Sequence, residues 1–161
     1  FVSKVQYVDN ANEEIDALNH ILPTETAVVD IRFKEKLRGL TESHKDSLST
    51  IEMTSYAPNR LTYKTSNSQD AVAVFSEIYY PDGWHVTIDG QAAKPARADY
   101  MLRALYIPAG EHTVEMRFDP VSLHVTEGIA YGASALLVIG VMIAAIRARK
   151  SYLAEKLHSS K

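Results

Sequence analysis

The sequence contains no cysteine among its 161 residues, and this absence excludes several kinds of protein. A disulfide-stabilised scaffold, a thiolate zinc site and a cysteine nucleophile all require thiols. The sequence also has no glycine-rich phosphate loop, no pair of histidines at metal-binding helical spacing and no Gly-x-Ser-x-Gly elbow. It therefore predicts no local catalytic residues, no metal site and no cofactor.

Charge is distributed unevenly along the chain. Residues 1–127 carry 12 Lys/Arg against 19 Asp/Glu, a net charge of −7, and residues 128–146 carry no charge. Residues 147–161 carry five basic residues against one acidic residue, a net charge of +4. Because the large N-terminal part is acidic and its cations are scattered, we expect no nucleic-acid partner.

The uncharged stretch predicts a transmembrane helix with membrane lipid as its partner. Gly128–Ile146 has the sequence GIAYGASALLVIGVMIAAI, and a helix of that length spans roughly 28 Å, close to the hydrocarbon thickness of a bilayer. We expect the helix over residues 126–147. A buried helix of a soluble core is the alternative, although such a helix usually keeps a polar stripe.

The basic residues after this stretch predict the orientation of the chain. Arg147, Arg149 and Lys150 follow it directly, and Lys/Arg are enriched on cytoplasmic flanks. We therefore expect a cytoplasmic basic tail at residues 148–161 and an extracytoplasmic location for residues 1–125.

The start of the sequence favours a longer parent protein. It begins at Phe1 with no initiator Met, no signal peptide and no earlier span that could export residues 1–127. We expect the chain to be the end of a polytopic membrane protein. Small residues four apart, Gly128 with Gly132 and Gly140 with Ala144, would allow other helices of that protein to approach closely.

Residues 49–125 have the pattern of an antiparallel β-sandwich. In Glu111–Phe118, apolar and polar residues alternate strictly, as in a strand with one buried face. Trp84–Ile88 alternates similarly and ends at Asp89-Gly90, a dipeptide typical of a two-residue hairpin turn. The first half of Ala71–Tyr80 is apolar on both faces, which predicts a central strand. Six or seven short strands are expected in all.

Residues 1–40 have a different pattern. A strand at Lys4–Val8, a helix at Asn12–Leu22 and a second strand at Ala27–Phe33 predict a small β-α-β segment. Asp9, Asn10 and Asn12 are candidate caps for the helix. Residues 41–48 are polar and are expected to link this segment to the sandwich, so that the fold class is mainly β with one C-terminal helix.

Aromatic and basic residues form the candidate carbohydrate-binding site. Tyr79, Tyr80 and Trp84 flank a Pro-Asp-Gly turn. Aromatic rings beside Asp89, Arg97 or Arg103 could stack on a sugar and hydrogen-bond to it. The alternative is that Trp84 fills the core and the tyrosines cover its rim.

The remaining polar residues have structural interpretations. His112 lies on the apolar face of its strand, which favours a hydrogen-bonded core or rim histidine over a metal ligand. Asp89 is expected to stabilise the backbone conformation of its turn rather than to act as a catalytic acid or base. Arg97, Asp99 and Arg103 are expected to form ion pairs near the surface, with little net stabilisation.

Several stretches together resemble one protein family. FSEIYYPDGWHVTIDGQ (Phe75–Gln91) and RADYMLRALYIPAGEHTVEMRFDP (Arg97–Pro120), followed by a terminal apolar helix, resemble the C-terminal end of YfhO-family bacterial membrane proteins. Phe1–Asn19 and Thr26–Phe33 resemble the preceding segment in Bacteroides-type versions. Asp82 is an insertion relative to the family's tighter Pro-Gly-Trp turn.

The resemblance implies a polytopic protein of the bacterial cytoplasmic membrane, related to glycosyltransferases that use lipid-linked sugars and in some cases decorate cell-envelope polymers. The family's acidic catalytic residues lie on an early extracytoplasmic loop, so no catalytic residue is assigned in this sequence. Three hypotheses follow for residues 1–125. They could be an accessory part that holds an envelope glycan for a glycosyltransferase, or a carbohydrate-binding module in its own right. The third is a structural domain that caps the membrane helices or binds a partner protein.

Overall fold

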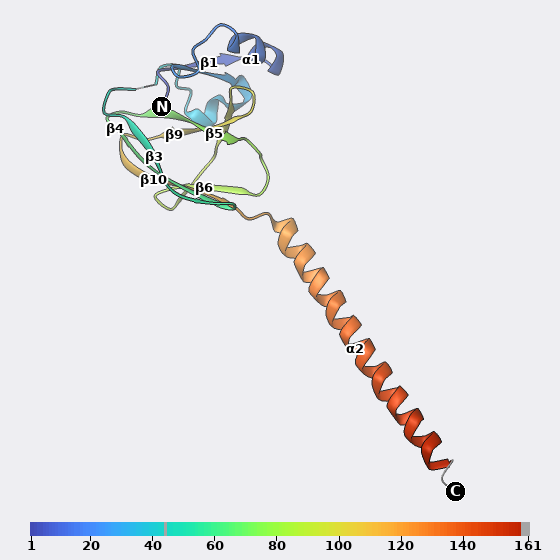
Figure 1. The fold of residues 1–161 in the computed structure, drawn as a ribbon. Helices are drawn as coiled ribbons and strands as arrows, with labels where there is room; N and C mark the ends of the chain where they lie inside the picture. Colours follow the sequence, from blue (N-terminus) through green and yellow to red (C-terminus); the bar gives the residue numbers. More distant parts are fainter. Residues whose placement is uncertain (44, 159–161) are drawn as a thin grey trace. The chain divides into compact units, whose positions relative to one another are not determined.

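Strands dominate residues 1–119, as the alternation of apolar and polar side chains predicts. The computed structural model describes residues 1–43 and 45–158, apart from the side chains of residues 123, 124 and 151–158. Within this range the chain divides into a strand-rich unit, Phe1–Asp119, and a helical unit that starts at Pro120 (Figure 1). The mainly β fold class, with a small N-terminal segment and one C-terminal apolar helix, is confirmed.

Two antiparallel sheets form the sandwich. The five-stranded sheet has the order β3-β4-β10-β6-β7, and the three-stranded sheet has the order β5-β9-β8. The strands are β3 (Thr50–Ala57), β4 (Arg60–Asn67), β5 (Ala71–Ile78), β6 (Trp84–Ile88), β7 (Gln91–Ala93), β8 (Ala96–Ala98), β9 (Leu102–Ile107) and β10 (Gly110–Phe118). Eight strands therefore occupy the region where six or seven were predicted, because β7 and β8 have only three residues each and are too short to show an alternation.

The core between the two sheets follows the predicted alternation. On β10, the side chains of Val114 and Met116 are fully buried, whereas Glu111 and Thr113, nearer the start of the strand, are exposed. Apolar residues from β4, β5, β6 and β9 complete this cluster. One face of each sheet is thus removed from water, which is the main source of stability for such a sandwich.

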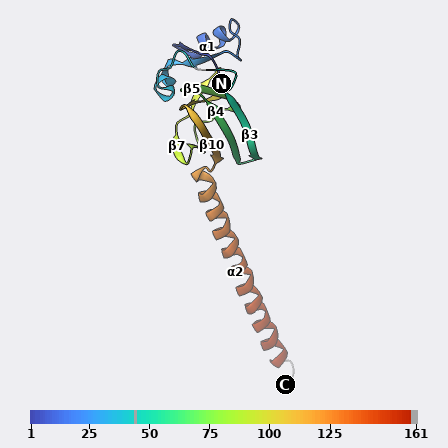
Figure 2. The ribbon, with the colours of Figure 1, turned by 90° about the vertical axis from the view of Figure 1, so that its left-hand side faces the viewer.

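The N-terminal segment adds a third layer. β1 (Lys4–Val8) and β2 (Thr26–Asp30) pair in parallel, and they are joined by α1 (Ala11–Leu18). A 3₁₀ helix, η1 (Ile31–Leu37), follows β2. Figures 1 and 2 both show α1 at the end of the unit away from the five-stranded sheet, so that the three-stranded sheet lies in the middle.

A second apolar cluster joins this layer to the sandwich. It contains Val5, Val29 and Leu37 from the N-terminal segment together with Val72 of β5 and Ala104 of β9. The three-stranded sheet is therefore buried on both faces, with the N-terminal segment on one side and the five-stranded sheet on the other.

The prediction that β5 is a central strand is wrong, because β5 lies at the edge of its sheet. Its apolar residues are buried for a different reason. Val72 contributes to one core cluster and Ala73 to the other. The free edge of the strand is covered by the N-terminus and by Ser43, since Val2 N donates to Val72 O at 3.1 Å and Ser43 Oγ accepts from Val72 N at 2.7 Å.

The polar run predicted as a linker is hydrogen-bonded to β1 and its neighbours. Val5 N donates to Thr41 O at 2.9 Å, and Ser43 N donates to Ser3 O at 2.9 Å. Residue 44 of this run lies outside the described residues. Through these bonds, residues 41–43 pack along the edge of the N-terminal layer, and the chain then continues to β3.

The first helix begins where its cap predicts and ends earlier than expected. The Asn10 side chain accepts from the backbone N–H groups of Asn12 and Glu13, so Asn10 is the N-cap. The helix stops at Leu18 rather than Leu22, because the next N–H groups make tight i−3 bonds, such as that of Asn19 to Asp16 O.

The second N-terminal strand is also shorter than predicted. The expected strand Ala27–Phe33 stops at Asp30, whose carboxylate accepts from Arg32 N and starts η1. An Asp side chain in this capping role favours a helical turn over continued strand.

The helical unit consists of α2 (Val121–His158). Its apolar window, Val125–Lys150, has 26 residues and contains an 18-residue stretch with a mean hydropathy of 2.3, none of which is buried within the protein. Among the described residues this is the single helix long and apolar enough to cross a membrane. The predicted span over residues 126–147 lies inside this window, and residues 159–161 of the predicted basic tail lie outside the described residues.

Candidate functional site

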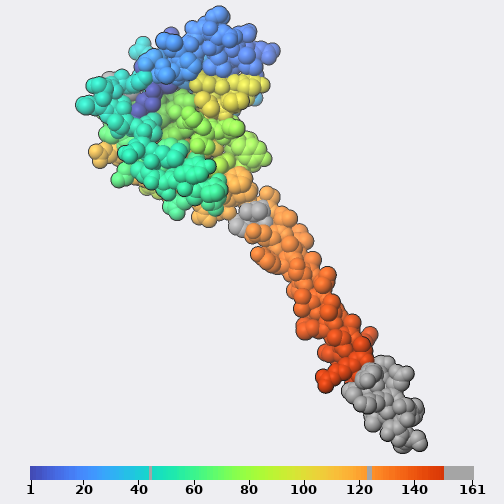
Figure 3. Space-filling model, in the orientation of Figure 1, coloured from blue at the N-terminus to red at the C-terminus, as the bar shows by residue number. Residues whose placement is uncertain are grey.

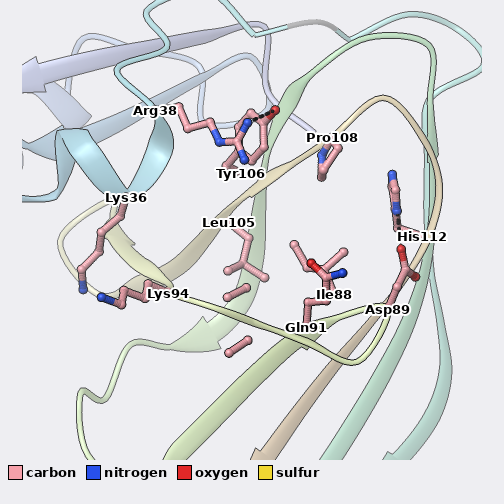
Figure 4. Close-up of a pocket in the computed structure, with 12 residues that line it drawn as sticks. Lys36, Arg38, Ile88, Asp89, Gln91, Lys94, Leu105, Tyr106, Pro108 and His112 are labelled. Atoms are coloured by element: carbon pink, nitrogen blue, oxygen red, sulfur yellow. Dashed lines mark hydrogen bonds and ion pairs between the residues drawn. The ribbon is translucent and has the colours of Figure 1, made fainter.

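Two adjoining pockets of the strand-rich unit share residues from β7 and the segment after it. The first, which we call the aromatic pocket, has a volume of about 400 Å³ and contains Tyr79, Tyr80 and Trp84 in its wall. The second, the cationic pocket, has a volume of about 440 Å³ (Figure 4). Side chains that line the cationic pocket include Lys36, Arg38, Asp89, Lys94, Tyr106 and His112. Both pockets are lined by Lys36, Ala92, Ala93 and Lys94.

The β6–β7 hairpin forms one wall of both pockets. Ile88 pairs with Gln91, which leaves Asp89 and Gly90 as a two-residue turn with φ values of 50° and 79°. Two successive positive φ values define the type I′ turn that suits the twist of a hairpin. The predicted Asp-Gly turn is therefore confirmed, and it carries the Asp89 carboxylate to the pocket rim.

Asp89 and His112 form a hydrogen-bonded pair across the sheet. Asp89 Oδ2 lies 2.6 Å from His112 Nδ1, and Asp89 Oδ1 accepts from Thr113 N at 2.8 Å. The other ring nitrogen of His112 lies 3.3 Å from Ala109 O. Hydrogen bonding to Asp89 raises the pKa of His112 above its ordinary value, and the same bond lowers the pKa of Asp89.

This pairing agrees with the expected hydrogen-bonded rim histidine. Both ring nitrogens of His112 face acceptors, which favours the protonated imidazolium because it donates from both. Among the described residues, no group of three or more potential metal-ligating side chains is close enough to hold an ion.

Arg38 stacks on the ring of Tyr106 at another wall of the cationic pocket. Its guanidinium carbon lies 4.0 Å from the ring centre, and its Nη1 donates to Tyr106 Oη at 3.1 Å. The Tyr106 hydroxyl in turn donates to Asp70, which also accepts from Ala109 N. Desolvation and then the Asp70 bond raise the pKa of Tyr106, while the Tyr106 bond lowers the pKa of Asp70.

Lys36 and Lys94 reach the place where the two pockets meet. Lys36 Nζ donates to Pro95 O at 3.0 Å and lies 5.6 Å from the ring centre of Tyr79. Lys94 is exposed and makes no hydrogen bond or ion pair with any residue that the structure describes. Figure 4 shows both lysine side chains directed toward the same side of the cationic pocket.

The aromatic pocket contains the three aromatic residues that the sequence singled out. Tyr79 is half-buried, and its ring meets that of Phe33 edge-on at 5.5 Å. Tyr80 is 54% exposed. Trp84 is partly buried: its ring centre lies 5.3 Å from that of Phe118, and the residue also lines the pocket. Trp84 thus contributes to the core and to the pocket wall together.

The two arginines of the predicted site lie elsewhere. Arg103 is 1% exposed and lines neither pocket; its Nη2 donates to Ile78 O at 3.0 Å. Burial lowers the pKa of its guanidinium. Arg97 also lines neither pocket, and its Nη2 donates to Glu14 Oε2 at 2.7 Å. The carbohydrate-binding role of all five residues stays a prediction; only the aromatic three line one pocket, and Arg103 lies beneath Trp84 in the core.

The expected surface ion pairs among Arg97, Asp99 and Arg103 are wrong. Asp99 is 8% exposed and accepts from Val28 N at 2.8 Å, and desolvation raises its pKa. Arg103 makes no ion pair with any described residue. Asp99 lies in the short β8–β9 connection and Arg97 lies on β8, whose three residues show no alternation. Arg103 lies on the six-residue β9, and its packing against Trp84, a residue distant in sequence, decides that it is buried.

Sequence reasoning singled out Asp89 and His112 of the cationic pocket but did not identify its basic residues or Tyr106. Lys36 and Arg38 belong to the N-terminal segment, whereas Lys94, Tyr106 and His112 belong to the sandwich. One signal was present: Arg32, Lys34, Lys36 and Arg38 concentrate four basic residues within seven positions of an acidic unit. That concentration indicates a local patch of positive charge.

One comparison with known proteins finds a match. A family model described as bacterial membrane protein YfhO matches residues 32–129. No curated protein and no solved structure matches the chain. The matched range includes every residue that lines the two pockets and reaches the start of the apolar window of α2.

Proposed function

This chain belongs to the YfhO family of bacterial membrane proteins, and on that premise we propose that its strand-rich unit holds a cell-envelope glycan for a membrane glycosyltransferase of which the chain is a part. In this proposal the unit lies outside the cytoplasmic membrane and α2 is the last membrane helix. The transfer reaction takes place on another part of the parent protein, and the strand-rich unit positions the acceptor.

The grouping of Tyr79, Tyr80 and Trp84 around one pocket carries the proposal. Sugar rings present C–H groups on one face, and these pack on aromatic rings while hydroxyl groups hydrogen-bond at the edges. Lys36 and Lys94 supply donors at the edge of the same pocket. An open pocket of about 400 Å³ that joins a second pocket suits an extended chain of sugars more than one small molecule.

Glycan binding can be measured by the fluorescence of Trp84, the single tryptophan of the chain. We would place the 161-residue chain in nanodiscs of zwitterionic lipid and titrate neutral oligosaccharides of glucose, galactose, mannose or N-acetylglucosamine. At least one should change the Trp84 emission saturably. Tyr80→Ala should weaken that binding about three- to tenfold, which corresponds to the loss of one aromatic contact.

Tyr56→Ala is the matched control, because Tyr56 is 72% exposed on β3 and lines neither pocket. It should leave glycan affinity unchanged. If no oligosaccharide alters the emission, or if both variants weaken binding equally, the aromatic pocket does not hold a glycan and the structural-domain hypothesis takes its place.

The structural-domain hypothesis is supported by the contacts of Trp84 with Phe118 and Arg103. Trp84→Ala is expected to unfold the unit under either hypothesis, since it removes a large core side chain. Tyr80 is therefore the informative position, because its exposed ring can be removed without opening a cavity.

The extracytoplasmic location rests on the basic residues that follow the apolar window and is testable by labelling. These 161 residues have no cysteine, so in a full-length protein without other accessible cysteines Glu111→Cys and Ser151→Cys each place one thiol before or after the apolar window. In intact cells that produce the full-length protein, a membrane-impermeant maleimide should label Glu111→Cys directly and Ser151→Cys only after permeabilisation. The reverse pattern would place the unit in the cytoplasm.

The glycosyltransferase role needs the full-length protein. Purified in lipid, it should transfer sugar from a polyprenyl-linked donor to an envelope acceptor, and Tyr80→Ala should raise the KM for the acceptor more than it lowers kcat. Absence of any transfer with a functional donor would refute this role.

A further inference from the structure

The cationic pocket differs in charge from the unit that contains it. Residues 1–119 carry 12 Lys/Arg against 18 Asp/Glu, a net charge of −6. The wall of the cationic pocket carries three permanent cations, Lys36, Arg38 and Lys94, and one carboxylate, Asp89. A local excess of positive charge on an acidic unit attracts anions selectively to that place.

The one carboxylate of the pocket does not neutralise these cations. Asp89 is bonded to His112 Nδ1 and Thr113 N, and both contacts hold its oxygens at the turn. The three cations also outnumber Asp89 together with the neighbouring Asp70 carboxylate. The pocket therefore keeps its excess of positive charge.

Among the described residues the hydrogen bonds of the three cations go to neutral groups, although the Asp70 carboxylate, bonded to the Tyr106 hydroxyl, also attracts Arg38. Lys36 donates to Pro95 O and to the hydroxyl of Tyr79, at 3.0 and 3.4 Å. Arg38 donates to the hydroxyl of Tyr106, and Lys94 has no hydrogen-bonding partner. The remaining donors of these groups are available to a ligand.

Arg38 is held in position by its backbone and by stacking. It adopts the left-handed conformation, with φ of 53°, at the end of η1. This is the conformation of a helix C-cap, in which Arg38 N donates to Glu35 O at 3.1 Å. The stacked guanidinium loses little further freedom when it binds an anion, and its planar donors suit carboxylate or phosphate oxygens.

We propose that the cationic pocket binds an anionic substituent of the same glycan that the aromatic pocket holds, so that the ligand of this unit is an acidic saccharide. The inference rests on the proposed function. Lys36 and Lys94 line both pockets, so a sugar ring packed against Tyr80 would present a neighbouring phosphate or carboxylate to Arg38 and Lys94.

The test compares neutral and acidic forms of one oligosaccharide on the 161-residue chain in zwitterionic nanodiscs. The neutral oligosaccharide that binds best is titrated beside its phosphorylated and its uronic-acid derivatives, with Trp84 emission as the readout. At low salt at least one acidic form should bind ten or more times tighter. Added salt should reduce this preference, because screening weakens attraction between exposed charges.

The substitutions separate a specific site from general attraction. Lys94→Gln and Arg38→Asn should each remove most of the preference for the acidic form while leaving the affinity for the neutral form unchanged. Asn tolerates the left-handed conformation of residue 38. Lys34→Gln is the matched control, because Lys34 lies on η1, loses the same charge and does not line the cationic pocket. It should keep the preference.

The outcomes distinguish this inference from the proposed function. Equal binding of neutral and acidic forms would overturn the inference and leave the proposed function intact, whereas no binding of either form would refute both.

Other outcomes would identify a different anion. If inorganic phosphate bound as tightly as the phosphorylated oligosaccharide, the inference that the ligand is a saccharide would be overturned. Loss of the preference in nanodiscs that contain phosphatidylglycerol would assign the pocket to lipid headgroups and overturn the inference. Retention of the preference in both variants would place anion binding elsewhere.

Discussion

The guanidinium carbon of Arg103 lies 4.5 Å from the centre of the Trp84 ring, and only 1% of the Arg103 residue is exposed. A cation stacked on indole away from water gains up to about 2 kcal/mol. Its Nη1 also lies 2.9 Å from Met116 Sδ, while its Nε has no partner in the described structure. Arg103 thus supports, from inside the core, the tryptophan that lines the aromatic pocket.

We predict that Arg103→Ala destabilises the strand-rich unit by about 2–4 kcal/mol, because it leaves a cavity and an unpaired Ile78 carbonyl. Arg103→Met should cost less, since it fills much of the volume and removes a buried charge. Denaturant unfolding of the chain in nanodiscs, followed by Trp84 emission, measures both. Arg117→Ala, at a residue exposed on β10, should change stability little. Equal stability of Arg103→Ala and Arg117→Ala would contradict this account.

Glu14 joins the N-terminal segment to the sandwich. It is fully buried, and it accepts from Arg97 Nη2 at 2.7 Å and from Tyr100 N at 2.8 Å. In Figure 3 the N-terminal segment lies directly against the residues near 100. We predict that Glu14→Gln destabilises the unit by about 1–3 kcal/mol, because one charge-assisted bond is lost in a buried place.

Asp16→Asn, on the exposed face of the same helix, is the control for Glu14→Gln and should change stability little. Hydrogen exchange provides the second measurement. Amides of β1 and β2 should lose protection in Glu14→Gln, and unchanged protection would show that the contact does not anchor the segment.

The Asp89–His112 pair predicts a pH dependence. Because the folded pKa of His112 is raised above 6.5, its stabilising contribution is complete below pH 6.5 and is lost as the pH rises through the folded value. Because the folded pKa of Asp89 is lowered from 3.8, its contribution is complete above that pH and is lost as the pH falls through the folded value. The pair therefore stabilises the folded unit most between pH 3.8 and pH 6.5.

NMR titration of the His112 ring tests this pair directly. In Asp89→Asn, which keeps a residue that tolerates the left-handed turn conformation, the pKa of His112 should fall toward 6.5. The stability difference between the two proteins should be larger at pH 5.5 than at pH 9. An unchanged His112 titration would show that Asp89 does not control it.

The apolar window of α2 predicts the effect of a central charge. Leu137 lies near the middle of Val125–Lys150, where an arginine costs about 2.5–3.5 kcal/mol of membrane insertion. Leu137→Arg should therefore lower the membrane-integrated fraction in an insertion assay, and Leu137→Phe should not. If the unmodified chain stayed in the aqueous phase without detergent, α2 would not be a membrane helix.

Much of the sandwich follows from local pattern. The alternation in Glu111–Phe118 and the Asp-Gly turn after Ile88 predicted the buried faces of β10 and the β6–β7 hairpin. These predictions succeed because burial of one face of a strand and positive φ values at a turn restrict the residues at each position. Where a strand has three residues, as in β8, no such restriction is visible.

The candidate site was only partly predictable. Tyr79, Tyr80 and Trp84 are close in sequence, so a turn sufficed to bring them together. Arg103 was expected on the surface, yet it lies beneath Trp84. Arg38 and Tyr106 are separated by 68 positions, and no local pattern indicates that one stacks on the other.

By itself the sequence determined the apolar helix, the mainly β class and the kinship with a family of membrane proteins, since each depends on composition or on short motifs. Only the tertiary structure decided that β5 is an edge strand buried on two sides, that Glu14 is inside, and that cations from η1 and its C-cap meet the cation that follows β7 in one pocket. The physical reason is that long-range packing selects among neighbours that are locally equivalent. A lysine in an exposed loop has the same local sequence signal whether or not another cation lies beside it.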